Sequence, residues 1–151
     1  MLFRSGCSGN QAIQSVDASG SPTCSSSFAP ASQVLSSGQV NTTSPDFGMT
    51  LLQSGNLTVS TSCETFAGEA DVGIKVSSGT FSFVSDLGST GNSAATGLPS
   101  GVGFVLGRAN PENQIHFSAL SSTGKTLNGD VMAIHTGSGT CTYEASGLAG
   151  G

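Results

Sequence analysis

The stretch QIHFSALSSTGKTLNGDVMAIHTGSGTCTYEAS, residues 114–146, decides the fold of this chain. Apolar and polar residues alternate in three short runs within it: 114–120, 130–135 and 140–146. Polar turn sequences separate these runs: SSTG at 121–124 with Asn128-Gly129, then TGSG at 136–139. Alternation with a period of two, bounded by Gly, Ser and Asn, is typical of antiparallel strands. The stretch therefore predicts a meander of three strands.

Similar short runs precede this meander. They lie at 47–52, 57–63, 70–76, 80–84 and 101–107, whereas the apolar pieces at 33–35 and 38–40 are too short to assign. The turn sequences QSGN and SSG join the first four runs into two hairpins. Alternation predicts the following inward-facing residues: Leu57, Val59, Thr61, Cys63, Val72, Ile74, Val76, Phe81 and Phe83. No apolar pattern with helical spacing persists over three turns, so we expect almost no helix.

About nine or ten short strands joined by turns predict an all-β fold, an antiparallel β-sandwich of jelly-roll or Greek-key type. The chain has no Trp, which excludes the Cys–Trp–Cys core of immunoglobulin domains. A bond between Cys63 and Cys141 would join an early strand to the last one. It would stabilise the fold by roughly 4 kcal/mol, because it closes a long loop.

The composition indicates a folded domain whose polarity comes from hydroxyls and backbone. Charged residues make up 9% of the 151 residues, against about 25% in an average soluble domain. Four Lys and Arg stand against nine Asp and Glu, and the net charge is −5. No basic stripe is present, so we expect no nucleic-acid partner. No apolar run approaches 18 residues, so we expect no membrane insertion.

The four cysteines predict two disulfides and an oxidising compartment. None forms a Cys-x-x-Cys pair, and the two histidines lie at no zinc-like spacing from them. Of three possible pairings we favour Cys7–Cys24 with Cys63–Cys141. We therefore expect an extracellular or cell-surface location, although this chain shows no secretion signal.

The chain is expected to divide into four parts. Residues 1–5 differ in character from the Ser- and Gly-rich residues after them, and we expect them to be a gene-assembly remnant with the natural chain extending further upstream. Residues 6–24 form a disulfide-tied hairpin, with a turn signal at DASG. Residues 25–32 form a linker, and residues 33–151 form the β-sandwich.

The N-terminal unit resembles small Cys-bounded units of bacterial and phage fibre and surface proteins. The matching residues cover about an eighth of the chain: Cys7, Gln11, Ile13, Val16, Gly20 and Cys24. In those proteins such units lie between stalk segments and a C-terminal head. The resemblance implies that residues 33–151 are such a head.

Acidic residues provide one candidate metal site. Glu64, Glu69 and Asp71 cluster in CETFAGEAD, and calcium binds six to eight oxygens of carboxylates, amides and carbonyls. The alternative interpretation is a set of solvated acidic loops. No other cofactor is indicated.

A long polar segment, residues 86–100, provides a candidate ligand loop with Asp86 and Asn92. Loops of this length in compact domains are often functional.

The two histidines are weaker candidates. Alternation places His116 on the outer face and His135 on the same side of its strand as Val131 and Ala133, and the two would bind a metal if they met across neighbouring strands. The ordinary interpretation is that both are simple strand residues.

No motif indicates an enzyme. There is no Gly-x-Ser-x-Gly elbow, and the acidic residues suggest no paired carboxylates across a cleft. The leading hypothesis is a non-enzymatic structural or adhesive module, and the alternative is a monomeric glycan- or calcium-binding module. Edge strands without Lys make self-association as a trimer or polymer plausible, and a surface glycan is a second possible partner.

Overall fold

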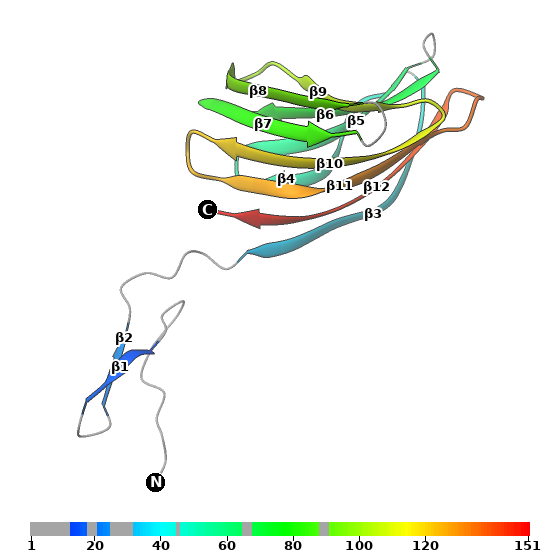
Figure 1. The fold of residues 1–151 in the computed structure, drawn as a ribbon. Coiled ribbons are helices and arrows are strands. Elements are labelled where there is room, and N and C mark those ends of the chain that lie inside the picture. Colours follow the sequence, from blue (N-terminus) through cyan, green and yellow to red (C-terminus); the bar gives the residue numbers. More distant parts are fainter. Residues whose placement is uncertain (1–12, 18–20, 25–31, 45, 65–67, 88–90) are drawn as a thin grey trace. The chain divides into compact units, whose positions relative to one another are not determined.

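The computed structural model describes residues 13–17, 21–24, 32–44, 46–64, 68–87 and 91–151 (Figure 1). The chain forms two compact units, residues 1–32 and residues 33–151. In the first unit, β1 (Ile13–Val16) pairs antiparallel with β2 (Pro22–Cys24). The Asp17 carboxylate accepts a hydrogen bond from the Ser21 backbone N–H at 2.9 Å. The predicted Cys7–Cys24 bond lies outside the described residues.

The second unit consists of two antiparallel sheets in a sandwich-like arrangement. The six-stranded sheet contains, in spatial order, β3 (Gln33–Thr43), β12 (Thr140–Gly150), β11 (Thr126–His135), β10 (Glu112–Ser121), β7 (Thr80–Asp86) and β8 (Asn92–Pro99). The four-stranded sheet contains β4 (Asp46–Ser54), β5 (Leu57–Glu64), β6 (Glu69–Val76) and β9 (Phe104–Ala109). The described residues contain no helix, which confirms the all-β prediction.

The structure corrects two local interpretations of the sequence. Asn128-Gly129 is not a turn but lies inside β11, where Gly129 pairs with Phe117 on one side and Gly147 on the other. A Cβ atom on either glycine would collide with backbone of the neighbouring strand, so these glycines permit a close approach of β11 and β12. The two apolar pieces at 33–35 and 38–40, each too short to assign from sequence, belong to one continuous edge strand, residues 33–43.

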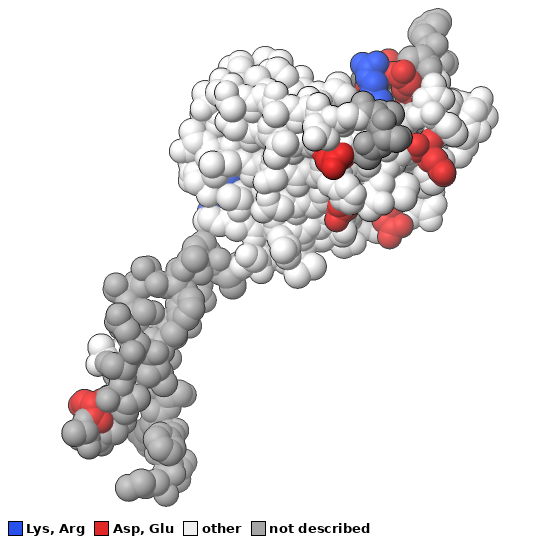
Figure 2. All heavy atoms as spheres, viewed as in Figure 1, with Lys and Arg blue, Asp and Glu red and all other residues white. Residues whose placement is uncertain are grey.

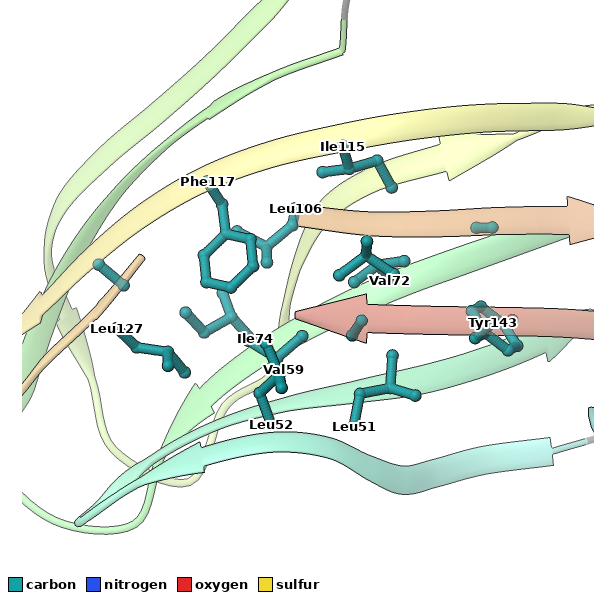
Figure 3. Packing of buried hydrophobic residues seen from close by; sticks show 14 of the residues in the cluster. Leu51, Leu52, Val59, Val72, Ile74, Leu106, Ile115, Phe117, Leu127 and Tyr143 are labelled. Atoms are coloured by element: carbon teal, nitrogen blue, oxygen red, sulfur yellow. The ribbon is translucent and has the colours of Figure 1, made fainter. Parts of the chain in front are cut away.

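The core lies between the two sheets, as Figure 3 shows for its central side chains. The predicted inward faces are confirmed: the nine residues expected there are all buried. The six-stranded sheet adds further fully buried side chains: Ile115, Leu127, Val131 and Tyr143. Successive residues thus alternate between core and solvent in the interior strands, as a half-buried sheet requires.

Polar and covalent contacts join the two sheets beyond apolar packing. A disulfide links Cys63 of β5 to Cys141 of β12, as predicted, with the Cα atoms 5.8 Å apart and a sequence separation of 78. The hydroxyl of buried Tyr143 donates to the Ser62 carbonyl at 2.9 Å. The hydroxyl of buried Ser85 donates to the Leu106 carbonyl at 2.7 Å. Each of these contacts crosses from the six-stranded to the four-stranded sheet.

Every edge strand of the two sheets carries an extra residue. The register slips within β3 against β12, twice within β4 against β5, within β8 against β7 and within β9 against β6. The interior pairings β10–β11, β10–β7, β11–β12 and β5–β6 run without interruption. Bulges bend and twist an edge, which opposes pairing with another chain.

A hydroxyl side chain occupies the hydrogen-bonding gap at each edge. Ser37 accepts from the Ala145 N–H at 3.0 Å in β3, and Thr61 accepts from the Met49 N–H at 3.1 Å in β4. The two other edges use hydroxyls of β7, which neighbours β8 in the six-stranded sheet and contacts β9 across the sandwich. There Ser82 accepts from the Gly97 N–H at 3.3 Å, and Ser85 supplies the donor for Leu106.

We expect removal of the intersheet disulfide to lower the free energy of unfolding by roughly 4 kcal/mol, because the bond constrains the unfolded chain. The test is the denaturant midpoint of C63A/C141A. Tyr143 is the only tyrosine, Trp is absent, and this ring is buried, so its fluorescence reports on the core. Reductant should leave the denaturant midpoint of the variant unchanged, whereas it should lower the midpoint of the wild type to that of the variant. Equal denaturant midpoints of the oxidised wild type and the variant would contradict the expectation.

Ser85→Ala should lower the free energy of unfolding by about 1 to 2 kcal/mol, because it leaves the Leu106 carbonyl without its donor. Ser118→Ala is the matched control, since the Ser118 hydroxyl is exposed and donates to Asn128 on the neighbouring strand. The control should change stability by less than about 0.5 kcal/mol. Equal effects of the two substitutions, measured by urea unfolding, would show that the buried hydroxyl is not needed at the bulge.

Candidate binding surface

The outer face of the six-stranded sheet carries a row of polar side chains across five neighbouring strands. Register places them side by side in the order Ser146, Asp130, His116, Asp86 and Asn92. The buried residues that flank them in each interior strand point to the core, so this row points to solvent. We call it the polar row.

A contact between His116 and Asp130 lies at the centre of the polar row. The Nδ1 atom of His116 meets the Oδ1 atom of Asp130, and both side chains are about half exposed. When Nδ1 carries its proton, it donates to the carboxylate. Asp86 lies directly opposite His116 on the other neighbouring strand. Two carboxylates therefore flank one imidazole across β11, β10 and β7.

The adjacent row of the same face is less polar. It runs across the sheet in the order Val34, Leu148, Asn128, Ser118, Val84 and Ala94. At its centre the Ser118 hydroxyl donates to the Asn128 side-chain oxygen. Its apolar members are strongly exposed: Val34 is 77% exposed and Leu148 49%.

A shallow depression of about 400 Å³ lies where the two rows meet on β11 and β12. It is lined by Val34, Asn128, Gly129, Asp130, Ser146, Gly147 and Leu148. The paired backbones of Gly129 and Gly147 form its floor, and the outward side chains of the neighbouring residues surround them. We call this feature the Gly129–Gly147 depression. It offers one carboxylate, one amide and one hydroxyl beside two aliphatic side chains.

The predicted ligand loop at residues 86–100 is largely a strand, which corrects the sequence interpretation. Asn92–Pro99 forms β8, and Asn92 pairs with Asp86 across the hairpin with β7. The hairpin is closed by a hydrogen bond from the Leu87 N–H to the Gly91 carbonyl at 3.0 Å. Asp86 and Asn92 are therefore brought together, but as the end of the polar row and not as a loop.

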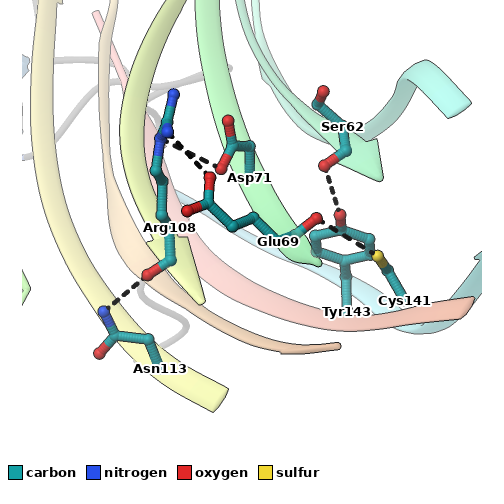
Figure 4. A network of polar contacts seen from close by, with 7 residues as sticks. All are labelled: Ser62, Glu69, Asp71, Arg108, Asn113, Cys141 and Tyr143. Atoms are coloured by element: carbon teal, nitrogen blue, oxygen red, sulfur yellow. Dashed lines mark hydrogen bonds and ion pairs between the residues drawn. The ribbon is translucent and has the colours of Figure 1, made fainter. Parts of the chain in front are cut away.

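The acidic cluster predicted as a calcium site is occupied by an arginine (Figure 4). Glu64 and Glu69 pair across β5 and β6, and Asp71 lies two residues further along β6. The Arg108 guanidinium meets Glu69 at 2.8 Å and Asp71 at 3.4 Å. Since this cation already contacts two of the three carboxylates, calcium would have to displace it. In the described part of the chain, no three His, Cys, Asp or Glu side chains converge in a metal-binding geometry.

Asp71 is the buried member of this network. Its side chain is 3% exposed, and one of its oxygens has no hydrogen-bond donor within the described residues. Burial raises the pKa of Asp71 from 3.8 to about 6, Arg108 lowers it, and the charges of Glu64 and Glu69 add to the rise. The carboxyl is therefore partly protonated in mildly acidic solution.

A second hollow, of about 420 Å³, lies beside this network along the edge strand β9. Leu87, Val105 and Arg108 are among the residues that line it. Among the described lining residues, Arg108 is the only cation, and it is already engaged with Glu69 and Asp71. The hollow thus offers mostly apolar walls.

The two histidines do not meet. His116 lies on the outer face, whereas His135 lies at the end of β11 with its Nδ1 accepting from the Gly137 N–H at 3.2 Å. They are on opposite faces of the sheet, because His135 follows the inward residues Val131 and Ala133 at even spacing. The idea of a metal held by both histidines is wrong.

Charged side chains are sparse on the surface of residues 33–151. In the view of Figure 2 the acidic side chains lie toward one end of this unit, and most of the rest of the visible face is uncharged.

Sequence reasoning found the exposed position of His116 but not its neighbours. The register of five strands determines these neighbours, and alternation within one strand carries no information about register.

No family model matches the chain, and neither the curated proteins nor the solved structures contain a match to it. Among the described residues, no helix is long and apolar enough to cross a membrane.

Asp71→Asn should flatten the dependence of stability on pH between about 4 and 6. The folded pKa lies above the unfolded value of 3.8, so the native state binds more protons in this range. The stabilising contribution of Asp71 is complete below the unfolded pKa and is lost as pH rises through about 6. We expect a loss on the order of 1 to 2 kcal/mol in the wild type.

Urea unfolding at pH 4 and pH 7 measures this difference. Glu69→Gln is the control, because it removes the closer Arg108 ion pair but leaves the buried carboxyl in place. The control should keep most of the wild-type pH dependence, because burial is the largest cause of the raised Asp71 pKa and the Glu69 charge is the smallest. If the stability of D71N changes with pH as steeply as that of the wild type, another titratable group causes the pH dependence.

Proposed function

We propose that this chain is a non-enzymatic extracellular adhesive module, the C-terminal head of a bacterial or phage surface or fibre protein, and that it binds through the outer face of the six-stranded sheet. The observation that carries this proposal is the polar row. Five neighbouring strands present hydrogen-bonding side chains to solvent in one line. Such a line suits a polar ligand spread over a surface.

The order of the units supports the same proposal. A small hairpin unit precedes a larger two-sheet unit, which agrees with the resemblance of residues 7–24 to Cys-bounded units ahead of a head. The Cys63–Cys141 bond suits an oxidising environment.

We also propose a Greek-key connection for the sandwich. β9 lies beside β6 and β10 lies beside β7, although β7 and β8 separate the first pair in sequence and β8 and β9 separate the second. Within residues 33–151 the chain passes between the two sheets four times, and two of these crossings, from β6 to β7 and from β9 to β10, lie at neighbouring positions. Non-local neighbours of this kind are typical of Greek-key sandwiches.

If subunits associate, we propose a closed oligomer such as a trimer, not an edge-to-edge polymer. The sequence leaves the edges with few Lys residues, which by itself would favour pairing between edges. The structure places a bulge in all four edge strands of residues 33–151. These bulges make a continuous ladder between two copies unfavourable.

A charge placed in the middle of the outer face tests the adhesive proposal. Ser118→Glu should reduce binding of the full chain to intact bacterial cells and to a broad glycan array by about tenfold, because it introduces an unpaired charge at the contact. Lys75→Glu is the matched control, an exposed substitution to Glu on the four-stranded sheet. It should leave binding within about twofold. Equal losses for both variants would contradict a role for this face.

A further inference from the structure

We propose that the Gly129–Gly147 depression is a subsite for one neutral sugar residue of a surface glycan. This inference rests on the proposed adhesive function and adds the chemical class of ligand and its position. The depression lies on the interior strand β11 and its neighbour β12, whose pairing is uninterrupted. The lining residues of β11 and β12 are therefore held by continuous sheet, and Val34 is added from the edge strand β3.

The polar side of the depression matches a pair of adjacent sugar hydroxyls. His116 holds one oxygen of Asp130, so the carboxylate is oriented and its second oxygen accepts from a ligand hydroxyl. The side-chain oxygen of Asn128 accepts from Ser118, which directs the amide NH₂ of Asn128 to act as donor. Asp130 and Asn128 lie on the same face of β11, two residues apart. One acceptor and one donor are thus placed next to each other.

The apolar side matches the C–H surface of a sugar ring. Val34 and Leu148 line the depression and are paired across β3 and β12. Both are exposed, so covering them with ring carbons removes apolar surface from water. Between the two sides the ring would lie over the backbone of Gly129 and Gly147, whose side-chain positions face Phe117 and Leu52 in the core. The volume of about 400 Å³ lies in the range of small-ligand sites.

The charge of the site selects an uncharged ligand. Among the described lining residues, Asp130 is the only ionisable one, and the whole chain carries a net charge of −5. A carboxylate or sulfate on the sugar would be repelled by Asp130 and would find no cation in this described lining. We therefore infer a neutral hexose or deoxyhexose, not a sialic or uronic acid.

Amide NMR shifts of the full chain test the assignment. The probes are the methyl glycosides of galactose, glucose, mannose and fucose, with N-acetylneuraminic acid as the anionic comparison. We expect at least one neutral glycoside to shift the Gly129 and Gly147 amides in a saturable way. The anionic sugar should leave both amides in place.

Two substitutions on the same face separate the site from its surroundings. Asp130→Asn should weaken binding of the neutral glycoside about tenfold, because the remaining side-chain oxygen would accept from His116 and an NH₂ donor would replace the ligand-facing acceptor. Glu144→Gln is the matched control, because Glu144 is an exposed carboxylate on β12 two residues from Ser146. It should keep the affinity within about twofold. Leu148→Ala provides an independent check and should weaken binding through loss of apolar contact.

Three results would overturn the inference: no shift of either glycine amide with any probe, shifts confined to the hollow along β9, or equal affinity in D130N and the wild type. The adhesive proposal is separable from it. Adhesion that still depends on Ser118, without any shift at the glycines, would preserve the binding face and reject the sugar subsite. If Ser118→Glu also leaves adhesion unchanged, both proposals fail.

Discussion

Hydrogen bonding at the edges of the two sheets is the constraint on which the structure depends. A bulge interrupts the backbone ladder and leaves N–H or C=O groups without partners, which is costly when they are buried. Here a Ser or Thr hydroxyl meets such a group at each of the four edges, for example Thr61 at Met49 and Ser85 at Leu106. The high content of hydroxyl residues, which at first suggests only a neutral surface, thus has a structural role. It lets edges be bent without loss of hydrogen bonds.

Directional contacts have a similar role between the sheets. Aliphatic and aromatic side chains fill most of the core, but their contacts have no preferred direction. They do not by themselves determine how one sheet is positioned over the other. The Cys63–Cys141 bond, the Tyr143 hydroxyl and the Ser85 hydroxyl join particular points of one sheet to particular points of the other. Such contacts specify one packing among several that would bury similar apolar area. They also explain how a chain with 36% hydrophobic residues reaches a defined core.

The sequence predicts the interior of this fold well and its edges poorly. Leu57 to Cys63 and Val72 to Val76 show unbroken alternation, and the structure buries the residues expected. In β3 and β8 the extra residue resets the period in mid-strand, so an interpretation with a fixed period of two finds only short pieces or a loop. The prediction of a turn at Gly129 is wrong for a different reason. Asn-Gly normally signals a turn, but here Gly is required by the close approach of β11 to β12.

The candidate site could be predicted only in part, because it depends on register across strands. Alternation places His116 outside, yet it does not show that Asp130 and Asp86 lie on either side of it. The acidic cluster is visible in the sequence as three carboxylates, but its partner Arg108 lies almost forty residues away and enters only through the pairing of β9 with β6. The bulges and the polar row together suggest a division of roles within one sheet. Bent edges oppose pairing with other strands, while the uninterrupted interior strands hold a row of side chains in fixed positions, and this fixed row is what a surface ligand can recognise.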